Sequence, residues 1–252
     1  MHQLDIFADS LPVQQANVLI AALRRFDSTA SRQALQSLTS TDPANVGLPH
    51  FQVLCEFVDN WSTDCDALGR PRTPAAVADA AQLISEQIIP AAVTMGDAGT
   101  ALVRKCWSDL ARASEAVGIG PDHADCFAAE LYLRAWQSPD VVRTAQGIPG
   151  AALRAAVQRW LGLGYCRCGK TGSARSAVFR YAWLAPKRFS AFVEEMGDAA
   201  LTRDWLNFQA DLDDLDATWF PAWCVHEKKT GAAMLDSLPS GDGPLAYRLC
   251  SP

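Results

Sequence analysis

The sequence predicts an all-α fold in which antiparallel helical hairpins stack on one another, with about 10–12 helices in total. Three observations lead to this prediction. Apolar residues keep helical spacing over long stretches, helix start and stop signals recur along the chain, and stretches in which β-branched and polar residues alternate are absent. The expected architecture is either a solenoid of stacked hairpins or a helical bundle.

Signals for helix boundaries are present in both halves of the chain. Thr73-Pro74 and Ser138-Pro139 combine a capping residue with a proline, as is typical of helix starts. Gly118, Gly147 and Gly197 follow helical patterns and are expected to end helices. Between such signals the stretch HFQVLCEFVDNW (50–61) places five residues on one helical face: Phe51, Leu54, Cys55, Val58 and Trp61.

An internal similarity suggests a repeat. The stretch LYLRAWQSP (131–139) is matched 47 residues later by VFRYAWLAP (178–186), and AAL at 151–153 is matched by AAL at 199–201. The tryptophans Trp136, Trp160, Trp183 and Trp205 recur every 22 to 24 residues, about one helix and its connection. A non-repetitive helical domain with regular helix lengths explains the same spacing and stays open as the alternative.

Residues 120–210 loosely resemble the tetratricopeptide type of helical repeat. The stretch RWLGLGY (159–165) is similar to the Trp, Leu-Gly and Tyr positions of the first repeat helix, and Phe179, Ala182 and Pro186 are similar to positions of the second. Several spacings differ by about one residue from the pattern. The resemblance implies a scaffold for protein contacts without identifying a partner.

The predicted organisation is an extended segment over residues 1–11 followed by one helical domain over 12–252. Residues 217–252 are expected to cap the stack, because WFPAWCVH (219–226) is the densest aromatic cluster of the chain. A ligand pocket lined by these aromatic residues is the less favoured alternative.

Composition narrows the classes of function. The net charge of −6 and the pI near 5.2 argue against direct nucleic-acid binding, which depends on clustered Lys and Arg. No secretory signal and no membrane-spanning stretch is recognisable, so we expect a cytoplasmic protein with reduced cysteines. The basic residues are mostly Arg, which is a weak indication of a bacterial source.

The stretch GYCRCGKT (164–171) matches the phosphate-loop pattern through Gly164, Gly169, Lys170 and Thr171. A phosphate loop follows a buried strand, whereas the residues before this stretch have helical spacing. We therefore interpret it as a turn between two helices and keep a nucleotide-binding enzyme as an alternative function.

A zinc-stabilised module is a further alternative, because Cys166, Cys168, Cys224 and His226 provide four soft ligands. The gap of 55 residues between Cys168 and Cys224 does not fit common zinc motifs. The acidic stretch DLDDLD (211–216) lacks the glycine and closing glutamate of a calcium loop and is expected to be a solvated helix end. The four histidines show no nucleophile–base arrangement, so we predict neither a catalytic residue nor a cofactor.

The residues Gln3, Leu4, Asp5, Ile6 and Phe7 form the stretch QLDIF, which resembles the short peptide by which bacterial replication and repair proteins bind the DNA polymerase sliding clamp. The resemblance implies an extended peptide anchored by Leu4 and Phe7, with hydrogen bonds from the Gln3 amide. Packing of Leu4 and Phe7 on the first helix is the alternative. Ser10 and Pro12 predict that this helix starts after the motif.

Together these observations predict a non-enzymatic module that binds other proteins, with the sliding clamp as the candidate partner. No membrane and no direct nucleic-acid contact is expected.

Overall fold

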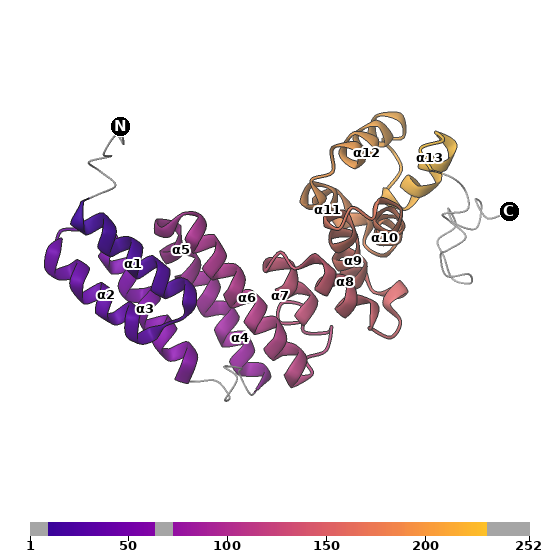
Figure 1. Ribbon diagram of the computed structural model, residues 1–252. Coiled ribbons are helices and arrows are strands. Elements are labelled where there is room, and N and C mark those ends of the chain that lie inside the picture. The colour runs from indigo at the N-terminus through magenta and orange to yellow at the C-terminus, as the bar shows by residue number, and fades with distance from the viewer. Residues whose placement is uncertain (1–9, 64–72, 231–252) are drawn as a thin grey trace. The chain divides into compact units, whose positions relative to one another are not determined.

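The computed structural model describes residues 10–63 and 73–230, with the side chains of Ser62 and Thr63 left out, and it is all-α (Figure 1). Over these residues the prediction of an all-α fold without strands is confirmed. The helices of the first half are α1 (Leu11–Arg25), α2 (Ser28–Thr41), α3 (Leu48–Thr63), α4 (Pro74–Leu83), α5 (Ile89–Ala92), α6 (Asp97–Val117) and α7 (Ala128–Arg134). Those of the second half are α8 (Ser138–Gln146), α9 (Ala155–Arg167), α10 (Thr171–Leu184), α11 (Phe189–Met196), α12 (Ala199–Asp211) and α13 (Phe220–His226). None of the described helices has the length and apolar character needed to cross a membrane.

Contacts between residues divide the chain into two compact units, Met1–Trp136 and Gln137–Pro252. The single helical domain over 12–252 stays a prediction.

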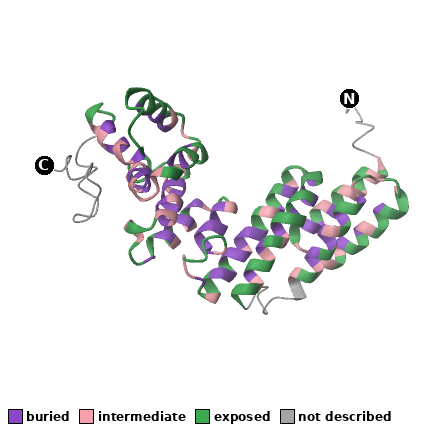
Figure 2. Cartoon of the chain, turned by 180° about the vertical axis from the view of Figure 1, so that it is seen from behind, coloured by how far each residue is buried: buried purple, intermediate pink, exposed green. Residues whose placement is uncertain are grey.

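In the first unit, α1 packs on α2, α2 packs on α3, and α6 contacts α1, α4, α5 and α7. The predicted inner face of α3 is found in the structure, since Phe51, Leu54, Cys55 and Val58 are all buried. Trp61 is only half-buried and lies against Phe57, with 5.0 Å between the ring centroids. Buried residues line the inward faces of the helices in this unit, as Figure 2 shows.

A π turn over Ile84–Ile88 joins α4 to α5, so these elements form one helical segment. Pro90 explains the turn, because its ring would clash with the carbonyl of residue 86 in a regular α-helix and it has no N–H to donate. The wider turn is closed by the N–H of Ile89, which donates to the carbonyl of Ile84. The proline is therefore tolerated without breaking the helix.

In the second unit, α9 and α10 form a hairpin that also contacts α8, α11 and α13. Its core is a group of aromatic rings around Phe220, whose centroid lies 5.3 Å from that of Phe189 and 5.5 Å from that of Trp205. The ring of Trp205 meets that of Phe220 edge-to-face, an arrangement that is favourable for aromatic pairs at this spacing. The described part of the predicted cap, residues 217–230, thus contributes to the core of this unit, and residues 231–252 lie outside the described part.

The two similar stretches of the sequence occupy comparable places, each at the end of a helix followed by a proline that begins the next helical turn. Their tryptophans differ. Trp136 follows α7 with a left-handed backbone (φ 61°) and is 59% exposed, whereas Trp183 lies inside α10 and donates from Nε1 to the carbonyl of Thr218. Trp160 is buried in α9, so the regular tryptophan spacing does not reflect equivalent packing positions. The repeat stays a prediction.

Candidate functional site

The phosphate-loop pattern lies at the turn between α9 and α10. Gly164 is inside α9, where a Cβ would meet Val142 Cγ2 at 2.9 Å, so this glycine allows close packing of α9 on α8. Gly169 has a left-handed backbone (φ 71°) and ends the helix, as glycine commonly does.

Two backbone amides of this turn, those of Gly169 and Lys170, are bonded within it. The N–H of Gly169 donates to the carbonyl of Cys166 at 3.0 Å, and the N–H of Lys170 donates to that of Tyr165 at 2.9 Å. This pair of hydrogen bonds is a Schellman motif, a common way to satisfy the last carbonyls of a helix. A phosphate loop instead follows a strand and directs its amides to the phosphates. The interpretation as a turn therefore accounts for the geometry of Gly164, Gly169, Lys170 and Thr171.

The four candidate zinc ligands do not lie together in one site. Cys166 and Cys168 are half-buried at the α9–α10 turn, Cys224 is fully buried in α13, and the side chain of His226 is 86% exposed. Within residues 10–63 and 73–230, no group of three or more His, Cys, Asp or Glu residues is placed to hold a metal ion. The acidic stretch 211–216 begins at Asp211, the last residue of α12, and is exposed, as predicted for a solvated helix end.

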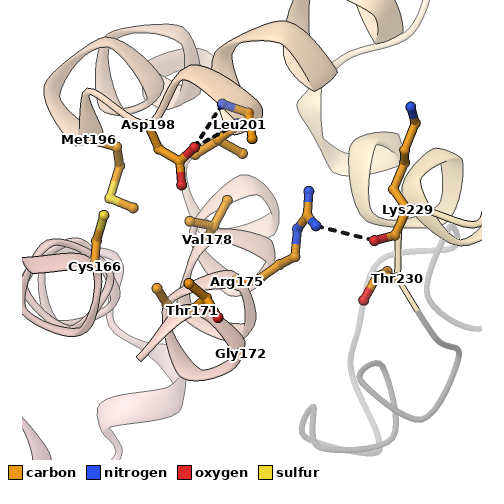
Figure 3. Close-up of a pocket in the computed structure, with 12 residues that line it drawn as sticks. Cys166, Thr171, Gly172, Arg175, Val178, Met196, Asp198, Leu201, Lys229 and Thr230 are labelled. Atoms are coloured by element: carbon orange, nitrogen blue, oxygen red, sulfur yellow. Dashed lines mark hydrogen bonds between the residues drawn. The ribbon is translucent and has the colours of Figure 1, made fainter. Parts of the chain in front are cut away.

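A cavity of about 350 Å³ lies beside the same turn, and its residues are shown in Figure 3. It has the volume of a small ligand pocket, and its lining is mainly apolar. The wall comes from α9, α10, the end of α11, the start of α12 and the chain after α13, with the following residues: Cys166, Thr171, Gly172, Ala174, Arg175, Val178, Met196, Asp198, Ala200, Leu201, Lys229 and Thr230.

Arg175 and Lys229 of the cavity wall form a charged cluster with the buried Asp204. Asp204 is 4% exposed, and its Oδ2 accepts a hydrogen bond from Arg175 Nη2 at 2.6 Å. Lys229 Nζ lies 3.8 Å from Asp204 Oδ1, and Arg175 Nη1 donates to the backbone carbonyl of Lys229 at 3.2 Å. A buried carboxylate requires such partners, since an unpaired buried charge is strongly unfavourable. The cluster thus fixes the chain after α13 to α10 and α12.

Asp198, Cys166 and Met196 line another part of the wall (Figure 3). Asp198 caps α12, because one carboxylate oxygen accepts from the N–H groups of Ala200 at 2.8 Å and Leu201 at 3.1 Å. Burial raises the pKa of the Cys166 thiol, and the charge of Asp198 raises it further. The thiol is therefore neutral near pH 7 and is a poor nucleophile.

No protein-family model, no curated protein and no solved structure matches this chain.

Cys166 and Thr171, the candidates for zinc and nucleotide binding, both lie in the cavity wall, but neither the cavity nor the charged cluster was predicted from the sequence. Arg175, Asp204 and Lys229 come from three segments with no common motif, and only the tertiary fold brings them together. The predicted clamp-binding residues Gln3, Leu4, Asp5, Ile6 and Phe7 lie outside the described residues.

Proposed function

We propose that this chain is a non-enzymatic, cytoplasmic protein-binding module that binds the bacterial sliding clamp through residues 3–7. The observation that carries the proposal is the stretch QLDIF, in which each position fits the clamp-binding peptide. Leu4 and Phe7 supply apolar anchors, and Gln3 supplies an amide for hydrogen bonds.

The start of α1 is compatible with this role. Ser10 precedes the helix with an extended backbone (φ −69°, ψ 141°), and Pro12 lies in its first turn. The motif ends three residues before Ser10, so α1 does not need to unwind for the motif to bind in an extended form.

Exposed apolar residues on α1 extend the available contact surface. Leu11 and Val18 are 57% and 59% exposed and lie seven residues apart, on the same side of the helix. The α1 surface is therefore available to a protein that holds the preceding peptide.

The helical surfaces are proposed to bind a second protein, as the tetratricopeptide-like resemblance implies. The packing of α9 on α10 supports this, since stacked hairpins present continuous helical faces. The identity of that partner does not enter the proposal.

The enzyme alternative rests on nucleotide binding at residues 164–171. Stabilisation against heat by ATP, lost in Lys170→Ala, would favour it. Because the amides of Gly169 and Lys170 are bonded within the turn, we expect no shift of the melting temperature with ATP. Zinc stabilisation through Cys166, Cys168, Cys224 and His226 would be favoured by stoichiometric zinc in the purified protein.

Surface plasmon resonance on an immobilised bacterial sliding clamp tests the proposal. We expect saturable binding by the full chain and at least about a tenfold loss of affinity in Leu4→Ala/Phe7→Ala, because anchor residues dominate such interfaces. Leu206→Ala, an exposed leucine of α12 outside both the motif and α1, is the matched control and should bind within about threefold of the wild type. Equal binding by the double variant, or no binding by the wild type, would reject the clamp as partner.

A further inference from the structure

The charged side chains of the cavity are arranged unevenly. Arg175 and Lys229 both belong to its wall, whereas Asp204, the carboxylate that they share, does not. Two positive charges are thus balanced by one negative charge, and the negative charge is on a side chain that is 4% exposed. This part of the wall therefore presents an excess of positive charge to the cavity, which favours an anionic group in a ligand.

Both cations keep donor capacity after forming these contacts. Among the described residues, Arg175 donates from Nη2 to Asp204 and from Nη1 to the carbonyl of Lys229, and a guanidinium has further N–H donors. Lys229 Nζ lies 3.8 Å from Asp204 Oδ1, which is beyond hydrogen-bond distance. A ligand carboxylate in the cavity would accept hydrogen bonds from both side chains, and such charge-assisted bonds are stronger than those between neutral groups.

The backbone at the end of α13 sets the position of Lys229. Lys228 has a left-handed backbone (φ 53°), and its N–H donates to the carbonyl of Val225 at 3.0 Å. The N–H of Lys229 donates to the carbonyl of Cys224 at 2.9 Å, which completes a Schellman motif. Figure 3 shows the further bond from Arg175 to the Lys229 carbonyl. The ammonium therefore extends from a fixed point of the wall, so less conformational entropy is lost when it binds a ligand.

The carboxylate of the wall, Asp198, is compensated by the backbone. One of its oxygens accepts from the N–H groups of Ala200 and Leu201, in the first turn of α12. The partial positive charge of a helix N-terminus stabilises such a carboxylate, so its attraction for a ligand cation is weakened. Of the charged side chains in the wall, Arg175 and Lys229 are thus the ones that set the charge of the ligand.

The remaining wall favours an apolar group of limited size. It includes the apolar side chains of Ala174, Val178, Met196 and Leu201, and the cavity volume is about 350 Å³. An apolar cavity of roughly 150 Å³ holds one benzene molecule, so by the same ratio this cavity has room for about 14 non-hydrogen atoms. That number corresponds to a carboxylate with a short apolar chain.

We propose that the cavity binds a small amphipathic carboxylate, with its charged group at Arg175 and Lys229 and its apolar part against Val178, Met196 and Leu201. An unbranched carboxylic acid of about eight carbon atoms fits within the volume. An uncharged ligand would leave the positive excess without a counterion, and a cationic ligand would add to it. The inference does not depend on the proposed clamp binding.

Isothermal titration calorimetry of the full chain with octanoate tests the proposal, with 1-octanol and octylamine as matched ligands of the same chain length. We expect saturable binding of octanoate, and affinities at least about tenfold lower for octanol and octylamine. The comparison separates recognition of the carboxylate from burial of the apolar chain.

Lys229→Met removes one cation of the wall, while Arg175 keeps its hydrogen bond to Asp204. This variant should bind octanoate about tenfold more weakly and octanol within about twofold of the wild type, a difference that a general loss of structure would not produce. Lys187→Met is the matched control, since Lys187 is an exposed lysine that does not belong to the wall. Its affinity for octanoate should equal that of the wild type.

Gly172→Leu blocks the cavity. Gly172 belongs to the wall, and no atom of the described residues beyond its own turn of helix lies within 4 Å of an added Cβ, so the new side chain has room. The variant should keep the unfolding midpoint of the wild type or exceed it, because leucine is more favourable than glycine inside a helix. Its affinity for both octanoate and octanol should fall at least about tenfold, because the leucine occupies the space of the apolar chain.

Alkylation of Cys166 locates the bound ligand, because this half-buried thiol lies in the wall. With octanoate at about ten times its dissociation constant, N-ethylmaleimide should modify Cys166 about tenfold more slowly than without it, as followed by peptide mass spectrometry. Cys126 of the first unit is also half-buried and does not belong to the wall, so its rate should not change.

Three results would overturn the proposal. Equal affinities for octanoate and octanol would mean that the cavity selects apolar surface alone. Tighter binding of octylamine than of octanoate would mean that Asp198 sets the charge of the ligand. The site would also be excluded if octanoate showed no saturable binding, or if its binding were unchanged in Gly172→Leu.

Discussion

The backbones of Gly99 and Ala92 are in such close contact that a Cβ on Gly99 would lie 1.9 Å from the Ala92 carbonyl oxygen. Gly99 lies in the first turn of α6, and Ala92 ends α5. Both residues are buried, and the atom that would clash belongs to the backbone, so a side-chain rotation cannot relieve it. The close approach of α5 and α6 therefore requires glycine at position 99.

Gly99→Ala should destabilise the protein by about 2–4 kcal/mol, because α6 must move away from α5 to accommodate the methyl group. Urea unfolding followed by circular dichroism measures this loss. Gly172→Ala is the matched control, since no atom of the described residues beyond its own turn of helix lies within 4 Å of its added Cβ. The stability of this variant should be unchanged or higher by up to about 1 kcal/mol, because alanine is more favourable than glycine inside a helix. A loss of the same size in both variants would contradict the account.

Phe220→Ala should cost about 3–5 kcal/mol, since the ring is fully buried among Phe189, Trp205 and Phe208. The near-ultraviolet circular dichroism of the tryptophans should change together with the unfolding midpoint. Leu206→Ala serves as the control, because Leu206 is exposed on α12 and its removal leaves no cavity. If the free energy of unfolding of Phe220→Ala lay within about 1 kcal/mol of the wild-type value, the aromatic core would be misassigned.

Asp204→Ala should destabilise the protein by roughly 2–4 kcal/mol, because Arg175 and Lys229 lose their common partner. Asp198→Ala removes only a helix cap and should cost about 1 kcal/mol. A double-mutant cycle with Arg175→Met and Asp204→Leu measures the coupling of this pair directly. Additive effects of the two substitutions would mean that the pair contributes nothing to stability.

Buried thiols should make stability fall at alkaline pH. Burial is the main cause that raises the pKa of Cys55 to about 11 and that of Cys224 to about 12, from a usual value of 9.0. Above pH 9 the unfolded chain loses these protons before the folded chain does, so the free energy of unfolding decreases as the pH rises. The stability from these groups is complete below pH 9 and is lost as the pH approaches the folded pKa values.

Urea unfolding at several values between pH 8 and pH 10.5 checks this dependence. The decrease in stability should be smaller in Cys55→Ala/Cys224→Ala, although this variant is less stable at pH 7 because it loses buried side-chain atoms. An unchanged pH dependence in this variant would contradict the assigned thiol pKa values.

Helix identity was predictable where the signals are local. Thr73 caps α4 as expected, with its hydroxyl accepting from the N–H of Ala76, and Gly118 and Gly197 end helices with left-handed backbones. Each of these features depends on residues within one turn of the helix end, so the sequence contains the information directly.

Features that depend on distant residues were not predictable. Trp160 is 1% exposed, whereas Trp136 is largely exposed, although both belong to the same regular spacing. The difference arises because neighbouring helices set the environment of each side chain. Two glycines of the phosphate-loop pattern have structural roles that the pattern does not reveal, since Gly164 packs against Val142 and Gly169 ends α9. The cavity itself requires the joint placement of α9, α10 and α12.

The most direct measurement of the central claim uses the motif without the fold. A fluorescent peptide of residues 1–10 is titrated with a bacterial sliding clamp, and the anisotropy is followed as unlabelled full-length protein is added. The account predicts saturable binding of the peptide and complete displacement by the full chain, with affinities within about tenfold of each other, because Leu4 and Phe7 supply the anchors. The account would be contradicted if the peptide did not bind the clamp. It would also be contradicted if full-length Leu4→Ala/Phe7→Ala displaced the peptide as well as the wild type does.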